Sequence, residues 1–479
     1  MKLYGESCFS PDKSFGIASP IPELLRRFMY RAFPERTAPL HAENVGMADM
    51  LHVCAGQGFQ GEIRVPGDKS ISHRALLFGA LADGETDISG FLDSEDTDAT
   101  AGCLRAMGVQ ITRGDVVRVR GVGLHGLHVP GQPLWVGNSG TTTRLLLGIL
   151  AGQSFPTTLE GDASLNRRPM DRVALPLRQM GAEVDGQGPR CTPPVTVRGG
   201  RLRAIAYASP VASAQVKSAI LLAGLSAEGL TTVTEPEKSR DHTERMLRGF
   251  GVVVEEDGLT VGVRGGQTLR GQTVVVPGDI SSAAFFLVGA AIIPRASVTV
   301  RGVGVNPTRS GLLDVLRAMG ADLTLSNLRE EGGEPVADLT VRHGALRGTE
   351  IGGSLIPRLI DELPVLAVAA AVADGVTVIR DARELRVKES DRIVTVARFL
   401  RAMGAEVEER EDGLVIQGGR PLHAADVESD GDHRIAMSAA IAALAAGVPA
   451  TIRGAASIAT SFPNFPALLR ELGACSLLK

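Results

Sequence analysis

Hydrophobic and polar positions follow one pattern that returns six times along the chain. The hexapeptide Leu-Arg-x-(Met/Phe/Leu)-Gly-(Ala/Val) begins at Leu104, Leu177, Leu247, Leu316, Leu400 and Leu469. Successive copies are 73, 70, 69, 84 and 69 residues apart, which predicts six copies of one folding unit. The glycine in the fifth place is typical of the residue that ends a helix. A strand-like run often follows, as at 182–184 and 252–254. The longest interval, between the fourth and fifth copies, contains residues 327–334, which we expect to form a surface loop insertion.

Each unit also contains an apolar run that follows a short polar segment. The runs, such as 145–151 and 365–372, are apolar on most sides and predict buried helices. The polar segments before them are 69–70, 138–141, 213–215, 279–282, 360–362 and 432–434. A helix starts with unpaired backbone N–H groups and a partial positive charge. We therefore expect the six helix starts to share a polar space.

A longer repeat predicts how the units divide between two domains. The segment Val-Pro-Gly-Asp-x-Ser at 65–70 returns at 276–281, 211 residues or three periods later. The expected fold is α/β, with two pseudo-symmetric domains of three units each. We place domain 1 at 56–66 plus 278–479 and domain 2 at 67–277, with hinge crossings near 65–68 and 276–279. This arrangement predicts a ligand cleft between the halves, with closure on binding.

Residues 1–55 do not share the repeat. They carry scattered proline, arginine and acidic residues, and they lack the pattern of a signal peptide. Their acidic content also differs from that of a transit peptide. We interpret 1–55 as a disordered extension, or as the product of a start codon placed upstream of Met47 or Met50.

Composition excludes several classes of protein. The 479 residues allow two or three domains, and 44% hydrophobic with 22% charged residues is ordinary for a globular protein. A net charge of −4 gives no basic field for nucleic acid, and 4% aromatic residues leave few stacking platforms. Charges interrupt the apolar runs before about 18 residues, so we expect no membrane span.

The five cysteines stand far apart, at positions 8, 54, 103, 191 and 475. Their number is odd and no CxxC occurs, so we expect neither a disulfide framework nor a zinc site. This usage favours a reducing cytoplasm.

The first polar segment carries the clearest candidate chemistry. Pro66 and Gly67 end an extended segment, and Lys69, Ser70 and Arg74 follow at the start of a predicted helix. Cations at a helix start form a binding site for a phosphate or a carboxylate. A plain N-cap with solvated cations would explain this segment alone. The recurrence of the segment in six units favours a function.

Other segments add cations and carboxylates at neighbouring helix starts. Gly140 lets a ligand approach the backbone without meeting a Cβ, and the fork of Arg168 suits a carboxylate or phosphate. The segment 386–392 is the densest charge cluster; on its own it would be read as a solvated face. Asp361 and the Asp-His-Arg run at 432–434 lie at the starts of neighbouring units. Carboxylates beside several cations are what proton transfer on an anionic substrate requires.

Two glycine motifs do not support nucleotide binding. The GxGxxG match at 121–126 is followed by residues that cannot open a helix, so a glycine-rich turn is the better interpretation. The Gly-Asp-Lys-Ser run at 67–70 lacks the spacing of a phosphate-binding P-loop.

Four segments together closely resemble the 5-enolpyruvylshikimate-3-phosphate synthase family. They are VPGDKSISHRA at 65–75, NSGTTTR at 138–144, RVKESDR at 386–392 and GDHRIAM at 431–437. The resemblance extends from about residue 57 to the C-terminus. It implies the enolpyruvyl transferase fold, with six βαβαββ units in two domains and an active site between them. The sixfold repeat agrees with that expectation.

The resemblance implies a transferase of the shikimate pathway, which leads to chorismate and the aromatic amino acids. The family joins shikimate 3-phosphate to phosphoenolpyruvate by addition and elimination, releasing phosphate. The implied contacts to shikimate 3-phosphate are Lys69, Ser70, Arg74, Ser213, Ala214, Gln215, Arg240, Asp361 and Lys388. The implied contacts to phosphoenolpyruvate are Lys69, Gly140, Arg168, Gln215, Arg392 and Arg434.

The resemblance also implies catalytic roles. Asp361 accepts the proton of the 5-hydroxyl group, and Glu389 or Lys69 handles the proton at the methylene carbon of phosphoenolpyruvate. No metal or organic cofactor is implied, and the expected state is a cytoplasmic monomer without nucleic-acid or membrane partners.

Two departures mark a subclass. The segments 213–215 and 238–244 resemble the second subclass of the family. In the enterobacterial or plant form of the family, a lysine precedes a Thr-Phe-Pro tract near the C-terminus. Here Thr460 precedes Ser-Phe-Pro, so the phosphoenolpyruvate contact made by that lysine is not carried over. Gly140 is the small residue that leaves room for glyphosate in the family, so we expect inhibition by glyphosate.

Two alternatives remain open at this point. A homologous enolpyruvyl transferase acts on UDP-N-acetylglucosamine and carries a cysteine in the loop before its Arg-Pro dipeptide; residues 161–166 here contain none. A non-catalytic anion-binding repeat protein would lack carboxylates paired with cations, such as Asp361 and Glu389 beside Lys388.

Overall fold

The computed structural model describes residues 49–54, 56 and 58–478, which belong to one compact unit, Met47–Lys479. The expected extension at 1–55 falls outside these residues at 1–48 and at 55. For Met50–Cys54 the expectation is wrong. These residues form strand β1, which pairs with β27 (Ala450–Arg453) and β28 (Cys475–Leu478). Leu51 and Val53 point into the core, so burial of two alternate side chains holds the strand in place.

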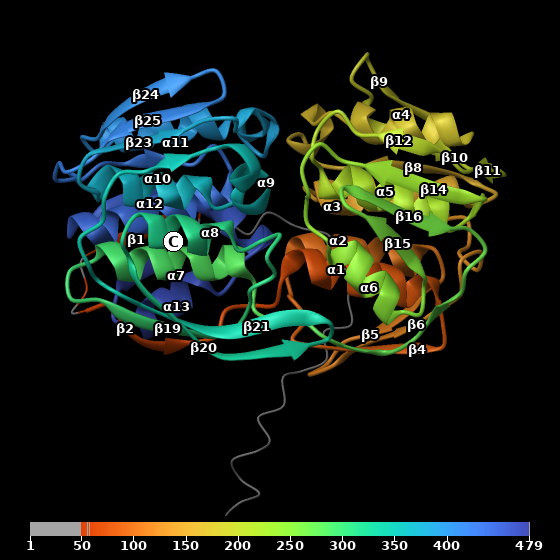
Figure 1. The fold of residues 1–479 in the computed structure, drawn as a ribbon, viewed down its shortest axis with the longest axis horizontal. Helices are drawn as coiled ribbons and strands as arrows, with labels where there is room; N and C mark the ends of the chain where they lie inside the picture. The colour runs from red at the N-terminus through yellow and green to blue at the C-terminus, as the bar shows by residue number, and fades with distance from the viewer. Residues whose placement is uncertain (1–48, 55, 57, 479) are drawn as a thin grey trace, which may run out of the picture. The chain divides into compact units, whose positions relative to one another are not determined.

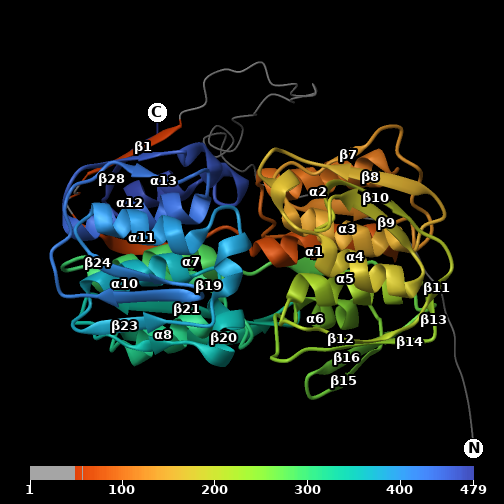
Figure 2. The same ribbon diagram turned by 90° about the horizontal axis from the view of Figure 1, so that it is seen from above.

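Two separate hydrophobic cores organise the described residues. One core gathers buried side chains from 51–65 and 280–474, and the other gathers them from 71–276. We call the elements around the first core lobe 1 and those around the second lobe 2. The ribbon colours follow this division: lobe 2 runs from orange to green, and lobe 1 from green to blue (Figures 1 and 2). Strands β1 and β2 (Gln60–Ile63), although early in the chain, pair with strands of lobe 1.

The same four-stranded sheet occurs six times among the described residues. Its first strand pairs parallel with the second, and the second, third and fourth pair antiparallel. In lobe 2 the sheets are β18 (Thr273–Val275), β4 (Glu85–Ser89), β6 (Val117–Arg120), β5 (Gln110–Thr112); β7 (Leu134–Trp135), β8 (Pro156–Glu160), β10 (Thr192–Arg198), β9 (Glu183–Gln187); and β12 (Ala206–Ala208), β14 (Leu230–Thr234), β16 (Thr260–Arg264), β15 (Val254–Asp257). In lobe 1 they are β2, β19 (Ser297–Gly304), β21 (Glu334–Arg342), β20 (Asp322–Glu331); β22 (Glu350–Ile351), β23 (Val376–Ile379), β25 (Gly413–Gln417), β24 (Glu406–Arg410); and β26 (Val427–Glu428), β27, β1, β28. Two further pairs, β3 (Ala82–Asp83) with β17 (Leu269–Arg270) and β11 (Leu202–Arg203) with β13 (Ala227–Glu228), join units within lobe 2.

Each unit contributes one buried helix and one amphipathic helix. The buried helices are α1 (Lys69–Leu81), α3 (Gly140–Ala151), α5 (Ala214–Gly224), α7 (Ile280–Ile292), α10 (Leu363–Val372) and α12 (His433–Ala446). The amphipathic helices are α2 (Glu95–Ala106), α4 (Asp171–Met180), α6 (His242–Gly249), α8 (Gly311–Ala318), α11 (Arg392–Ala402) and α13 (Phe465–Glu471). Each amphipathic helix ends at the repeated hexapeptide, where all six glycines have φ between 87° and 107°. Glycine adopts this left-handed conformation at no steric cost, which confirms the predicted helix ends.

The segments that join the two lobes lie side by side. The Asp68 N–H donates to the Pro277 carbonyl at 2.8 Å, and the Asp279 N–H donates to the Pro66 carbonyl at 2.9 Å. A Cβ at Gly67 would lie 1.9 Å from the carbonyl oxygen of Gly90, so only glycine fits there. The pairing brings the starts of α1 and α7 together.

Two sequence-based expectations are wrong. Residues 327–334 are not a loop insertion but the end of a long hairpin, since β20 continues to Glu331 and β21 begins at Glu334. Cys54 and Cys475 form a disulfide between β1 and β28. Neither outcome was accessible from spacing, because the hairpin depends on cross-strand pairing and the cysteines are 421 residues apart.

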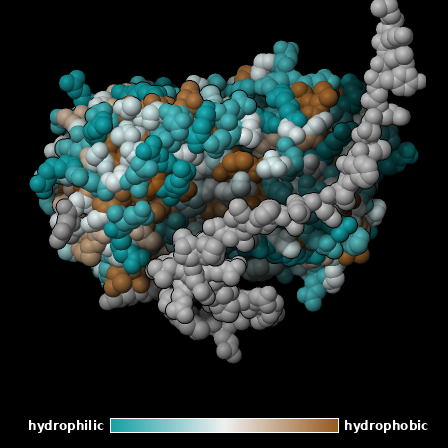
Figure 3. Space-filling view, turned by 90° about the horizontal axis from the view of Figure 1, so that it is seen from below, coloured by the Kyte–Doolittle hydropathy of each residue, from teal (hydrophilic) through white to brown (hydrophobic). Residues whose placement is uncertain are grey.

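One face of the molecule is mostly polar. On the face shown in Figure 3, hydrophobic residues occur as small separate patches among hydrophilic ones. No helix in the described part of the chain is long and apolar enough to cross a membrane.

Candidate active site

Lys69 begins α1 in lobe 2 and its ammonium group faces an acidic side chain of α2. Asp68 caps the helix by accepting from the Ile71 N–H at 2.9 Å. The Lys69 Nζ lies 3.0 Å from Asp96 Oδ2, and its backbone N–H lies 3.4 Å from Asp279 Oδ2 of lobe 1. The first helix start therefore touches both lobes.

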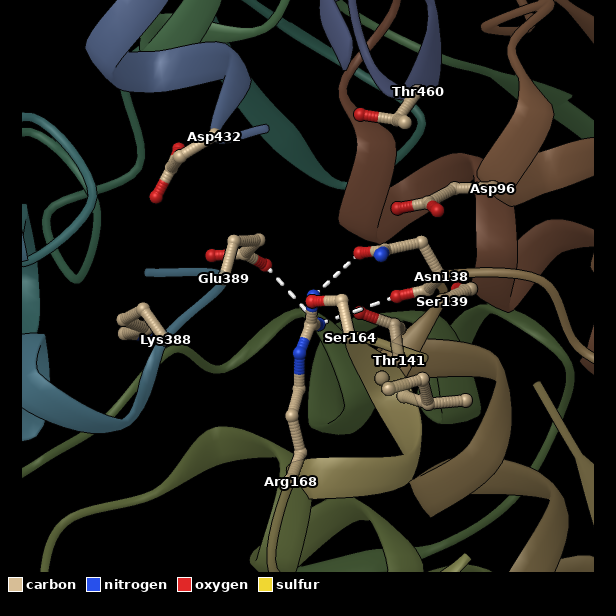
Figure 4. A network of polar contacts seen from close by, with 12 residues as sticks. Asp96, Asn138, Ser139, Thr141, Ser164, Arg168, Lys388, Glu389, Asp432 and Thr460 are labelled. Atoms are coloured by element: carbon tan, nitrogen blue, oxygen red, sulfur yellow. Dashed lines mark hydrogen bonds and ion pairs between the residues drawn. The ribbon is translucent and has the colours of Figure 1, made fainter. Parts of the chain in front are cut away.

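Arg168 extends from the segment before α4 into a cluster of polar oxygens. Its Nη2 donates to the Asn138 amide oxygen and, at 3.3 Å, to Ser164 Oγ. Its Nη1 donates to the Asn138 carbonyl at 3.2 Å and to Glu389 Oε1 of lobe 1 at 3.3 Å. Figure 4 shows the guanidinium group between Glu389 and the side chains at the start of α3. Within lobe 2, its partners are neutral.

Arg144 lies next to Arg168 and also has neutral partners. Its Nη1 donates to Gln215 Oε1 at 2.8 Å, and Gln215 donates to Thr141 Oγ1 at 3.0 Å. Burial, together with Arg168 and Arg172, lowers the pKa of Arg144 to about 10. A Cβ at Gly140 would lie 2.8 Å from the Arg144 Nη1 and 3.4 Å from the Arg168 Nη1. Glycine at this position keeps the space beside both arginines open.

Arg392, at the start of α11 in lobe 1, is fully surrounded by carboxylates. Its Nε lies 2.8 Å from Asp432 Oδ2, its Nη2 2.5 Å from Glu389 Oε2, and its Nη1 3.4 Å from Asp361 Oδ1. Its side chain is only 1% exposed, so these pairs are desolvated. Buried charges need such partners, because water no longer stabilises them.

Asp361 collects cations from both lobes. Lys388 Nζ lies 3.5 Å from Oδ1, Arg240 of lobe 2 pairs with Oδ2, and Arg434 Nη1 donates to the Asp361 carbonyl at 3.0 Å. Burial alone would raise the pKa of Asp361, but Lys388, Arg240, Arg434 and Arg392 outweigh it and hold this pKa well below its usual range. Arg392, Arg168, His433 and Lys388 likewise overcome burial and hold the pKa of Glu389 well below its usual range.

Within the described part of the chain, three ion pairs connect the two lobes at this site. They join Arg168 to Glu389, Arg240 to Asp361, and Arg172 to Glu384, the last at 2.9 Å. The partners are 221, 121 and 212 residues apart in sequence. We call this cluster of cations and carboxylates between the lobes the interlobe site.

The remaining predicted residues lie at its margins. Arg74 is 3% exposed and donates to Thr243, Ser218 and the Ser70 carbonyl; burial lowers its pKa to about 10. Ser213 occupies the N-cap position of α5 without a side-chain capping hydrogen bond, and Ala214 is the first residue of that helix. Burial, Lys69 and Arg434 push the pKa of His433 well below its usual range, so this ring is neutral. Thr460 lies within 3.3 Å of His433 Nδ1.

Sequence reasoning missed several members of the interlobe site. Asp96, Asn138, Arg144, Arg172 and Glu384 were not singled out as site residues. Asn138 and Arg144 stand within the 138–144 segment, so their proximity to Gly140 was a usable signal. For Asp96 and the pair Arg172–Glu384 the sequence offered no such signal, because only the folding of separate units brings these residues to the interlobe site.

Among residues 49–54, 56 and 58–478, no three His, Cys, Asp or Glu side chains are grouped as a metal site would require. A hollow of about 620 Å³ lies elsewhere, where α6 meets the β20–β21 turn, and is lined by residues such as Lys238, Asp241 and Arg245. It contains no residue of the interlobe site.

Comparison with known proteins decides the family. The sequence profile described as EPSP synthase (3-phosphoshikimate 1-carboxyvinyltransferase) matches residues 53–469. The chain belongs to the EPSP synthase family. The resemblance of the four segments is thereby confirmed, and the two alternatives are not favoured.

Relatives within this family are similar over nearly their whole length. The 3-phosphoshikimate 1-carboxyvinyltransferase of Pelotomaculum thermopropionicum is 58% identical over 425 residues, which cover 88% of this chain and 98% of the relative. That of Brevibacillus brevis is 55% identical, covering 88% of this chain and 100% of the relative.

Solved structures confirm the α/β enolpyruvyl transferase fold. An EPSP synthase from Acinetobacter baumannii is 49% identical, with a TM-score of 0.79 and coverage of 89% of this chain and 99% of the other. The enolpyruvyl transferase NikO from Streptomyces tendae, at 20% identity and a TM-score of 0.70, covers 89% of this chain and 98% of its own and shares the fold.

Proposed function

We propose that the protein transfers the enolpyruvyl group of phosphoenolpyruvate to the 5-hydroxyl of shikimate 3-phosphate and releases phosphate. The observation that carries this proposal is the convergence of Arg168, Lys388, Arg392 and Arg434 around Asp361 and Glu389. Lys69, which pairs with Asp96, lines a small hollow together with Arg434. Two substrates with several negative charges need clustered cations to leave water together. The names of the family and of its relatives support the same reaction.

Shikimate 3-phosphate would bind along lobe 2 and at Asp361. The proposed contacts are Lys69, Ser70, Arg74, Ser213, Ala214, Gln215, Arg240, Asp361 and Lys388. In support, Arg240 and Lys388 already approach Asp361 from opposite lobes. The start of α5 adds backbone N–H groups that suit a phosphate.

Phosphoenolpyruvate would bind between Arg168 and Arg434. The proposed contacts are Lys69, Gly140, Arg168, Gln215, Arg392 and Arg434. In support, Glu389 is the one carboxylate paired with Arg168 among the described residues and its other partners are neutral, so its positive charge is compensated less than that of Arg392. Gly140 leaves the space in which that anion would approach both Arg144 and Arg168. Glyphosate, an anion that competes for this space in the family, is expected to inhibit the enzyme.

Asp361 is proposed as the base for the 5-hydroxyl proton. Its carboxylate is ionised, but the surrounding cations make it a weak base in the free protein. Anionic substrates would neutralise part of that positive charge and so raise the pKa of Asp361. Proton acceptance is therefore coupled to the binding of both substrates.

Lys69 is proposed as the proton donor to the methylene carbon, with Glu389 as the other candidate. In support, Lys69 Nζ forms an ion pair with Asp96, whereas Arg392 and Arg168 keep Glu389 ionised. Protonation turns the methylene into a methyl group while the 5-oxygen bonds to the central carbon. The tetrahedral intermediate then loses phosphate and returns a proton from the methyl group.

The proposal extends to domain organisation and cellular context. We propose domains 56–66 plus 278–479 and 67–277, closing on substrate about the crossings near 65–68 and 276–279. The paired crossing segments support a hinge at that position.

We propose that the enzyme acts as a cytoplasmic monomer and without a metal or organic cofactor.

An assay of phosphate release tests the reaction. The purified protein is incubated with phosphoenolpyruvate, with and without shikimate 3-phosphate, and with UDP-N-acetylglucosamine as the alternative acceptor. Release that requires shikimate 3-phosphate supports the proposal. Release that requires the nucleotide sugar, or no release with either acceptor, contradicts it. Glyphosate at millimolar concentration, in competition with phosphoenolpyruvate, should lower the rate.

A further inference from the structure

A buried charged cluster in lobe 2 contacts the segments that contain Ser213 and Ser239. It has no role in the reaction described above. Lys217 of α5 places its Nζ 2.9 Å from Glu235 Oε2 and 2.7 Å from Glu244 Oε1. The three side chains are only 2–3% exposed. Burial would lower the pKa of Lys217, but Glu244 and Glu235 outweigh it and raise this pKa, so the lysine remains charged.

Glu235 differs from Glu244 in what it binds besides Lys217. Glu235 Oε1 accepts from the Ser213 backbone N–H at 3.0 Å. Its Oε2 accepts from Ser239 Oγ at 2.8 Å and from the Ser239 N–H at 3.4 Å. Glu244 accepts from Lys217, and its Oε2 has no hydrogen-bond partner within the described chain. Glu235 alone of the two joins separate backbone segments.

The segments that Glu235 joins carry the proposed contacts to shikimate 3-phosphate. Ser213 precedes Ala214 and Gln215 at the start of α5, and Ser239 precedes Arg240. One carboxylate therefore sets the distance between the helix start and the arginine that pairs with Asp361. The Lys217 Nζ, which also lies 3.5 Å from the Ser239 carbonyl, keeps that carboxylate in place.

We infer that Glu235, held by Lys217, is a positioning residue for shikimate 3-phosphate. This inference rests on the proposed function and adds to it a residue that does not touch the substrate. Without the charge on Glu235, the Ser213 and Ser239 segments lose their common acceptor. The substrate must then hold them in place, which lowers its affinity. Phosphoenolpyruvate should be affected less, because Gln215 is the one of its six proposed contacts that lies on a segment joined by Glu235.

A matched pair of substitutions tests the inference. Glu235→Gln and Glu244→Gln make the same chemical change to two carboxylates that bind the same lysine. The KM for each substrate, kcat, and the affinity for shikimate 3-phosphate by calorimetry are measured on the full chain, together with thermal unfolding. We expect Glu235→Gln to raise the KM and Kd for shikimate 3-phosphate by about 10- to 100-fold. We expect the KM for phosphoenolpyruvate to change by less than about threefold and Glu244→Gln to change neither KM by more than that.

A second variant covers the case in which Glu235→Gln does not fold. Glu235→Asp keeps the charge near Lys217 but is too short to reach both Ser213 and Ser239, so it should show the same selective loss. Equal effects of Glu235→Gln and Glu244→Gln, or equal changes in both KM values, would overturn the inference. If the unsubstituted protein binds no shikimate 3-phosphate, the proposed function itself fails, so the two failures are distinguishable.

Discussion

The two lobes present arginines to the interlobe site in different electrostatic settings. Arg392 of lobe 1 pairs with Asp432, Glu389 and Asp361, so its charge is compensated before any ligand arrives. Arg168 and Arg144 of lobe 2 bind mostly amide, hydroxyl and carbonyl oxygens. A compensated cation holds carboxylates at fixed positions, whereas an uncompensated one attracts an anion. Lobe 1 therefore orients the acid–base groups. Lobe 2 supplies cations that are compensated less, since Arg168 has Glu389 as its one carboxylate partner among the described residues.

Removal of Arg392 should have the largest effect. Arg392→Ala leaves Asp432, Glu389 and Asp361 without their common cation in a desolvated cluster. We expect phosphoenolpyruvate binding to weaken by roughly 2–4 kcal/mol and turnover to fall. Steady-state kinetics measures both, with Arg398→Ala as the control, because Arg398 lies exposed on the same helix. An unchanged KM and kcat would refute the assignment of Arg392.

Removal of Arg168 should have a smaller effect with a different signature. Arg168→Ala leaves no carboxylate without a cation, because Glu389 keeps its ion pair with Arg392 and the lobe 2 partners of Arg168 are neutral. We expect the KM for phosphoenolpyruvate to rise by the equivalent of about 1.5–3 kcal/mol, with little loss of thermal stability. Arg167→Ala, at the exposed neighbouring position, is the control. If Arg168→Ala lost more thermal stability than Arg392→Ala, the proposed difference between the two arginines would be contradicted.

Each lobe also buries a histidine near a helix start. Keeping such a histidine neutral should make the free energy of unfolding depend on pH. Burial, with Lys69 and Arg74, lowers the pKa of His73 to about 3. The unfolded chain therefore binds a proton near pH 6.5 that the folded chain does not. This contribution to stability should fall by about 1.4 kcal/mol per pH unit between pH 6.5 and the folded pKa of about 3, and it has no slope outside that range.

Denaturant unfolding at pH 7.5 and pH 5 measures this contribution. His73→Gln should lose less stability between the two pH values than the unsubstituted protein. His125→Gln, at an exposed site, serves as the control and should lose as much as the unsubstituted protein. A His73→Gln protein with the same pH dependence as the control would show that His73 is not neutral when buried.

Gly140→Ala should have the smallest effect. The added Cβ meets the Arg144 Nη1 at 2.8 Å, and the end of a flexible side chain can shift away. We expect a few-fold rise in the KM for phosphoenolpyruvate, or about 1 kcal/mol, and weaker inhibition by glyphosate. Gly102→Ala is the matched control, because a Cβ there meets nothing within 4 Å. Identical kinetics of the two variants would place the anion away from Gly140.

Much of the fold could be predicted from periodicity. The hexapeptide repeat indicated six units because each unit must end an amphipathic helix with a left-handed glycine, and all six glycines adopt that conformation. The buried helices were recognisable from apolar runs. The hairpin of β20 and β21 was mistaken for a loop, because its alternation is interrupted at the register shift between Ser326 and Arg329.

The sequence by itself determined the repeat, the helix boundaries and the polar helix starts, since these depend on interactions within about ten residues. It also determined the family, through motifs whose residues stand next to one another. The tertiary structure alone decided which charges meet: Lys69 with Asp96, Arg168 with Glu389, and Glu235 with both Ser213 and Ser239. The physical reason is that the free energy of a buried charge depends on partners from other units, and only the packing of those units brings them within hydrogen-bonding distance.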